Sequence, residues 1–175
     1  SSAASDVYKR QEVAREVGSS DIAYVQVEAV LAQCDLFLNE GAALQEKTQK
    51  AQKSWAQKEQ NLQAEAAQLQ EKYQKGLITT NDAQAQQQSI EKRVASYQSS
   101  AQKEAQALDE ENYVFTNRAQ DLLHRAVQEI NGDKKYKLII NATALIDADS
   151  TLNITPAVLA KVNELYAADK KAVKK

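Results

Sequence analysis

The chain has 175 residues, of which 26% are charged and only 6% aromatic, and its formal net charge is -2. This mildly acidic balance argues against general binding to nucleic acid or to anionic membranes. No apolar run approaches the roughly 18 to 20 residues that a transmembrane helix needs. Ala, Gln, Glu and Lys dominate the middle of the chain, a bias typical of long helices and coiled coils.

The first part of the chain divides into a leader and an apolar block. Residues 1–20 contain no apolar segment of the kind found in signal peptides, and we predict that they form a disordered leader. Residues 22–27 (IAYVQV) begin a β-branched stretch, which predicts a strand buried on both faces as far as Val30. Cys34 is the only cysteine, so we expect a small buried side chain and no intrachain disulfide.

A long helical hairpin is predicted from about residue 42 to residue 130. Gly76 supplies the left-handed conformation that ends a helix, and residues 79–82 are all good N-cap residues. The tip therefore falls at residues 76–80, and two helices joined by so short a connection run antiparallel. Apolar residues spaced by sevens and fours in the first helix predict a narrow seam: Leu44, Ala51, Trp55, Leu62, Leu69 and Tyr73.

The second helix shows a clearer seam with four-three spacing. Its members are Ile90, Val94, Tyr97, Ala101, Glu104, Leu108, Glu111 and Phe115. From residue 113 onward the helix becomes richer in apolar residues, which indicates a wider, core-facing stripe. We therefore expect this helix to leave the hairpin and enter a body.

The last part of the chain predicts short strands and a terminal helix. Residues 131–133 break the long helix, residues 136–140 form a second strand, and residues 141–146 form a third. Thr155 is expected to be the N-cap of the last helix, with Pro156 at its first position. Residues 170–175 are expected to be a frayed basic end.

These elements predict an α+β fold, mainly α, in which a small β-sheet body carries one long antiparallel helical hairpin. The body would comprise residues 21–41 and 115–175, and the hairpin residues 42–114. So small a body buries too little apolar area to be comfortably stable alone, which favours oligomerisation through the sheet. The residues expected at that interface are Val25, Val27, Leu138, Ile139 and Ile140.

Three stretches resemble the Skp (OmpH-type) family of periplasmic chaperones for outer-membrane proteins. They are residues 22–31 (IAYVQVEAVL), 137–147 (KLIINATALID) and 153–163 (NITPAVLAKVN), and the tip residues 75–79 (KGLIT) also look similar. The resemblance implies a homotrimer whose strands form the body and whose hairpins act as tentacles around unfolded outer-membrane β-barrel proteins, without ATP. It also implies a periplasmic location.

The resemblance suggests client contacts on the hairpin. Leu77 and Ile78 lie at the tip, where no partner helix is expected to bury them, and exposed apolar residues on such an arm favour binding. Tyr73, Trp55 and Tyr97 either close the seam or contribute to the same contact. Unlike the best-known, strongly basic members of the family, this chain is mildly acidic, which argues against direct contact with anionic lipid or lipopolysaccharide.

The sequence predicts no enzyme, cofactor or metal site. It has no Gly-rich phosphate loop, and His124 with Asp121 lacks a nucleophile, so a structural histidine is favoured. Asp147 and Asp149 fit a solvated turn better than a cation site, and the sequon at Asn141 is interpreted as chance. Two alternative functions remain open: a structural coiled-coil spacer or adaptor, and a prefoldin-like cytosolic chaperone, although prefoldin strands lie between the arm helices and these flank them.

Overall fold

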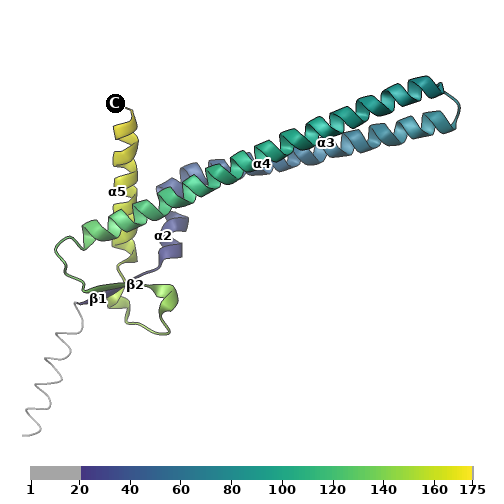
Figure 1. Cartoon of the computed structure of the whole chain (residues 1–175). Coiled ribbons are helices and arrows are strands. Elements are labelled where there is room, and N and C mark those ends of the chain that lie inside the picture. The colour runs from purple at the N-terminus through teal and green to yellow at the C-terminus, as the bar shows by residue number, and fades with distance from the viewer. Residues whose placement is uncertain (1–20, 175) are drawn as a thin grey trace, which may run out of the picture. The chain divides into compact units, whose positions relative to one another are not determined.

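The computed structural model of the chain describes residues 21–174, so the predicted disordered leader, residues 1–20, lies outside the described residues. The chain divides into two compact units (Figure 1). We call the first unit the body, which among the described residues contains 21–41 and the chain from Thr116 to residue 174. The second unit, Ala42–Phe115, is called the hairpin.

The hairpin is built from α3 (Ala42–Gln74) and the first part of α4 (Thr80–Ile130). α3 ends as predicted, because Gly76 has a φ of 70° and the N–H groups of Gly76 and Leu77 donate to the carbonyls of Tyr73 and Lys72, at 3.1 and 2.9 Å. This pair of bonds is the Schellman motif. The Thr79 hydroxyl then accepts the N–H of Asp82 at 3.1 Å and caps α4.

Polar bonds between side chains show that the two hairpin helices run antiparallel. The Lys47 ammonium contacts Glu111 at 2.5 Å, the Trp55 indole N–H donates to Glu104 at 2.7 Å, and Arg93 donates to Glu65 at 2.7 and 2.6 Å. The residue number on α3 rises as that on α4 falls. The seam between these polar bonds is narrow, and its buried members are Ala51, Leu69, Ile90 and Leu108.

The sheet of the body has two short parallel strands. β1 (Ile22–Val25) pairs with β2 (Leu138–Asn141), and Ile22 lies opposite Leu138. On its other side β1 meets the chain before the last helix, where Ile154 N–H donates to the carbonyl of Tyr24 at 3.0 Å. Within the described residues, β1 is therefore enclosed and the outer edge of β2 is open.

Two strand predictions are wrong. β1 stops at Val25, only Ala23 and Val25 are buried in it, and Val27 instead begins α2 (Val27–Gln33). The expected third strand at residues 141–146 is replaced by a 3-10 turn, η2 (Ala142–Ala144). The reason is local, because the Asn141 side chain accepts the N–H of Thr143 at 3.3 Å and turns the chain out of the sheet.

α5 (Thr155–Val173) covers the body beside α2. The N-cap prediction for this helix is wrong: the Thr155 hydroxyl accepts the N–H of Gln26 at 2.9 Å, and the side chain of Asn153 accepts the N–H of Thr155 at 3.0 Å. Thr155 thus ties α5 to the end of β1. The predicted frayed end is also wrong over its described part, since α5 continues to Val173.

The core of the body lies between β1, α2, α5 and the last turns of α4. Its largest fully buried side chains are Val25, Val30, Cys34, Leu36, Val158 and Val162. Two further short elements complete the body: a π-helical turn, η1 (Phe37–Gly41), and a 3-10 turn, η3 (Ser150–Leu152). Cys34 is buried, in agreement with its predicted role as a small filler.

Candidate functional site

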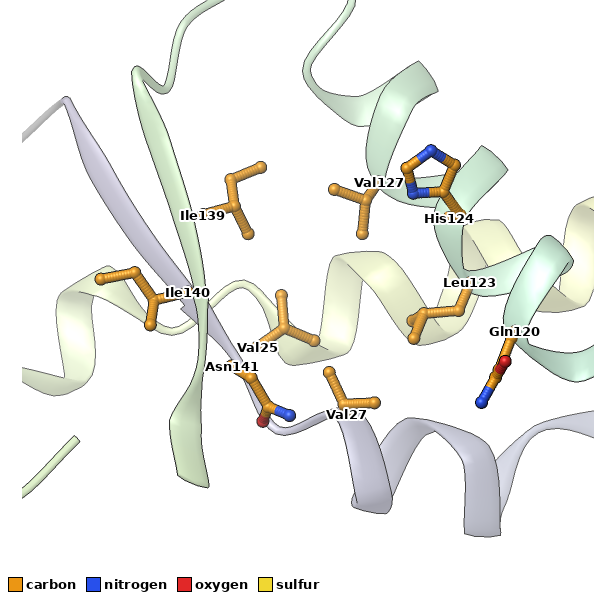
Figure 2. A pocket seen from close by; sticks show the side chains of 9 residues that line it. All are labelled: Val25, Val27, Gln120, Leu123, His124, Val127, Ile139, Ile140 and Asn141. Carbon is orange, nitrogen blue, oxygen red and sulfur yellow. The ribbon is translucent and has the colours of Figure 1, made fainter. Parts of the chain in front are cut away.

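An apolar groove of about 260 Å³ opens on the body between the strands and α4. Figure 2 shows Val25 and Ile139 on the strand side, and Leu123 and Val127 on the α4 side, around a common space. The full lining consists of Val25, Val27, Gln120, Leu123, His124, Val127, Ile139, Ile140 and Asn141. No Asp, Glu, Lys or Arg contributes to it.

Most of the residues predicted at an oligomer interface lie together in this groove. Val25, Val27, Ile139 and Ile140 line it, and Leu138 is 51% exposed beside Ile139 on the open strand β2. Val27 reaches the groove from the start of α2 and not from a strand. Apolar side chains beside an unpaired strand edge form a surface that favours burial by another chain.

The α4 side of the groove was not predicted from the sequence. Leu123 and Val127 lie one helical turn apart, and Gln120 and His124 repeat the same spacing on the neighbouring stripe of the helix. This spacing was visible in the sequence, but it was interpreted as part of a core-facing stripe. The helical spacing therefore indicates an apolar stripe on α4, but it does not indicate that the two-stranded sheet is too small to cover that stripe.

The possible acid–base pair at His124 does not form. The carboxylate of Asp121 contacts Arg125 at 3.4 Å, whereas Nε2 of His124 lies 3.1 Å from the amide nitrogen of Gln128. Arg125 is held more closely by Asp169 of α5, at 2.9 and 3.1 Å, and this hydrogen-bonded guanidinium lowers the pKa of the Asp169 carboxyl. The charged groups here form one ion pair within α4 and one between α4 and α5.

The closed end of the hairpin forms a second apolar surface. Leu77 is 69% exposed and Tyr73 is 50% exposed, while Ile78 is half-buried. The expectation that nothing covers the tip residues is therefore correct for Leu77 and wrong for Ile78. Trp55 and Tyr97 are half-buried along the two helices, and the indole N–H of Trp55 is bonded to Glu104.

Two of the charged pairs on the part of the hairpin toward its closed end are visible as ion pairs. Lys75 contacts Glu71 at 2.5 Å, and the bidentate bond from Arg93 lowers the pKa of the Glu65 carboxyl. Positive and negative groups therefore neutralise one another at short range, and little long-range field remains. Leu77 and Tyr73 are the exposed large apolar side chains of this end within the described residues.

A further exposed apolar pair lies at the other end of the hairpin. Tyr113 is 70% exposed and Val114 is 56% exposed, so the expectation that the core-facing stripe begins at residue 113 is wrong for these two positions. The stripe is buried only from Leu122 onward. The helical period explains the difference, because positions 113 and 114 fall outside the stripe that continues from Leu108.

The loop that carries Asp147 and Asp149 forms turns. The Asp149 carboxylate accepts the N–H and the hydroxyl of Thr151, both at 2.9 Å, and the backbone bond lowers the pKa of this carboxyl. Among residues 21–174 no cluster of three or more His, Cys, Asp or Glu side chains is placed to hold a metal ion. None of the helices in this part of the chain has the length and hydropathy to span a membrane.

The fold and its two apolar surfaces define a class of protein in which a small α/β body carries a long helical hairpin. The family model described as Outer membrane protein (OmpH-like) matches residues 21–162, which is more than half of the chain. The chain therefore belongs to the OmpH-like family. No curated protein sequence matches it.

A solved structure has the same fold. It is that of a proposed outer membrane chaperone (OmpH-like) from Caulobacter crescentus, with a TM-score of 0.70 and 16% sequence identity. The match covers 83% of this chain and 85% of the other. At this identity the likeness concerns the fold, and it agrees with the predicted mainly α fold with a small sheet.

Proposed function

We propose that the protein is a chaperone that holds unfolded outer-membrane proteins and prevents their aggregation. The observation that carries the proposal is the exposed apolar surface at the closed end of the hairpin, with Leu77 and Tyr73 at 69% and 50% exposure. Exposed apolar residues on a polar helical arm are a liability unless something binds there. Membership of the OmpH-like family and the name of the Caulobacter protein support a chaperone role.

The second part of the proposal is self-association of the body into a homotrimer. The groove and the open edge of β2 offer apolar side chains with no Asp, Glu, Lys or Arg in the lining. Identical copies carry identical charges, so an uncharged surface is one that they can bury together without like-charge repulsion. The number of three comes from the resemblance to the Skp family.

Trimerisation explains how weak contacts hold a client. A single hairpin end offers little apolar area, so one contact is feeble. Three copies joined through their bodies bring three hairpins to one client, and each bound hairpin raises the effective concentration of the next. Binding is then tight overall while every contact stays labile, and the client remains unfolded without ATP. We place this activity in the periplasm, where the resembling family works.

Two measurements test the proposal. Light scattering on the purified chain should give three times the monomer mass of 19.4 kDa, and the protein should suppress aggregation of a urea-denatured outer-membrane β-barrel protein on dilution. A stable monomer at micromolar concentration would remove the assembly model. An assembled protein that leaves the client to aggregate would favour the structural spacer instead.

A further inference from the structure

We propose that His124 makes association through the groove depend on pH, with the neutral imidazole permitting association and the protonated imidazole opposing it. This inference rests on the proposed self-association of the body. His124 is the only histidine in the chain, and it lies on the α4 side of the groove beside Val127 (Figure 2). It is exposed in the single chain, so association would move it from water into an apolar contact.

The partners of His124 within its own helix fit a neutral ring. Its Nε2 lies 3.1 Å from the amide nitrogen of Gln128, so this ring nitrogen can accept a hydrogen bond only when it carries no proton. The nearest carboxylate one turn earlier is Asp121, which is bonded to Arg125 at 3.4 Å. A positive charge on the ring would therefore lose the bond from Gln128 in its present orientation, while Asp121 is engaged with Arg125.

The neighbouring elements supply no compensating carboxylate to the groove. Asp21 and Lys137, just before the two strands, are paired with each other at 2.6 Å. On α5, Asp169 is paired with Arg125 and Lys161 with Glu129 and Glu164. Glu28 of α2 is exposed and absent from the lining. A protonated His124 would thus be buried as an uncompensated charge on association, which is costly.

The direction of the effect follows from proton linkage. A histidine side chain ordinarily takes up its second proton near about pH 6.5. If the associated state excludes that proton, protons bind the dissociated state preferentially, so association is strongest at alkaline pH and weakens progressively as the pH falls through the range in which histidines ordinarily become protonated. Between about pH 8 and about pH 5, the association constant should fall by up to roughly 30-fold for each subunit.

The test is sedimentation equilibrium of the full chain at about pH 8 and about pH 5, at constant ionic strength, with far-UV circular dichroism to check helix content. The parent should dissociate at the lower pH at concentrations where it is assembled at the higher one. His124→Gln, which cannot gain a charge, should give a ratio of the two association constants within about twofold of one. His124→Lys, which is charged at both pH values, should be weakly associated at both.

The outcomes separate the switch from the assembly that it regulates. A parent that is monomeric even at the higher pH contradicts the proposed self-association. A parent that assembles equally at both pH values contradicts the switch alone, and so does a His124→Gln variant that loses association on acidification as steeply as the parent. Because a ratio is measured for each variant, a general weakening of association by the substitution does not imitate the predicted result.

Discussion

The body and the hairpin bury their apolar residues in different ways, although the single helix α4 contributes to both. In the body, residues distant in the sequence meet in one core, where Leu36 and Val158 are 0% exposed. In the hairpin, two helices close a seam whose few buried side chains, such as Ala51 and Leu108, lie between polar bonds. The body is held by nonlocal packing, and the hairpin by helical structure and pairwise contacts.

This difference explains where binding surfaces are found. A two-helix seam cannot cover residues beyond its turn, so Leu77 remains exposed at the closed end. A sheet of two strands cannot cover the whole apolar stripe of α4, so the groove remains beside Leu123 and Val127. Each unit thus leaves uncovered the apolar surface that its small size cannot bury. We assign a client to the closed end of the hairpin and further copies of the chain to the groove of the body.

The largest effect is expected from a charge on the open strand edge. Leu138→Asp places a carboxylate beside the groove, and its burial without a partner should weaken association by on the order of 3 kcal/mol at each interface. Ile146→Asp is the matched control, because Ile146 is another exposed apolar residue of the body but belongs neither to strand β2 nor to the groove lining. Light scattering should show a monomer for the first variant and the parent mass for the second.

The next prediction compares the loss of stability caused by the same substitution in the two units, at two positions of helix α4. Leu122 and Leu108 of α4 have almost equal exposures of 3% and 4%, but Leu122 lies in the body and Leu108 in the hairpin. Leu122→Ala should destabilise its unit by about 3 kcal/mol, since a core with several layers closes poorly around a cavity. Leu108→Ala should cost about 1 kcal/mol, because a two-helix seam can collapse.

Hydrogen exchange resolved by residue measures these two losses separately. Trp55, the only tryptophan, gives an independent fluorescence signal for the hairpin. Equal losses in the two units would show that the hairpin is packed as tightly as the body.

A smaller effect is expected at the closed end. Replacing Leu77 and Ile78 together by Ser should weaken client binding by on the order of 1 to 3 kcal/mol, because apolar area is lost in three partly engaged copies. The matched control replaces Tyr113 and Val114 by Ser, which removes another exposed apolar pair of the hairpin. Fluorescence titration with a labelled client should show weaker binding only for the tip variant, with little change between low and moderate salt.

If only the Tyr113 and Val114 variant bound the client more weakly, the client contact would lie at that pair. Strong salt dependence of client binding by the parent would assign the contact to charged side chains along the hairpin. Both variants keep the helix caps and the seam, so circular dichroism should match the parent in each case.

The smallest effect concerns acid stability. Arg125 lowers the pKa of Asp169, so their ion pair stabilises the body above the ordinary carboxyl pKa of 3.8, and this contribution disappears as the pH falls through the lowered value. Asp169→Asn should therefore lose stability at neutral pH, by less than about 1 kcal/mol because both side chains are partly exposed. The stabilities of parent and variant should converge in acid, once the pH lies below that lowered pKa.

Urea midpoints at the two pH values measure this loss, and Asp147→Asn, at a position with no ion pair within residues 21–174, is the control. A constant difference at both pH values would contradict the electrostatic explanation.

The sequence predicted best the features that depend on neighbouring residues. The end of α3 at Gly76 and the cap of α4 at Thr79 follow from local backbone chemistry, and the structure has both. The predicted third strand failed because the side chain of Asn141 bonds to the backbone two residues later. The prediction that Thr155 is an N-cap was wrong because its hydroxyl accepts a hydrogen bond from Gln26, 129 residues away. A contact between residues so far apart leaves no periodic pattern in the sequence.

The candidate surfaces were also predicted only where they depend on neighbouring residues and not on contacts between distant ones. The strand side of the groove was expected from β-branched residues such as Val25 and Ile139, whereas the α4 side depends on how much of the helix the sheet covers. Leu77 was expected to be exposed because it lies in a tight turn, but the partial burial of Ile78 depends on the geometry of that turn. The client-binding and interface roles of these residues stay predictions.

The central claim is that the body assembles the protein and the hairpin holds the client. The most direct test replaces residues 44–114 by a short Gly/Ser linker, which the contact between Lys47 and Glu111 makes feasible because it brings the two ends of the hairpin together. We predict a shortened protein with three times its own monomer mass and no ability to prevent aggregation of a denatured outer-membrane protein. A shortened protein that still protects the client, or one that is monomeric, would contradict this division.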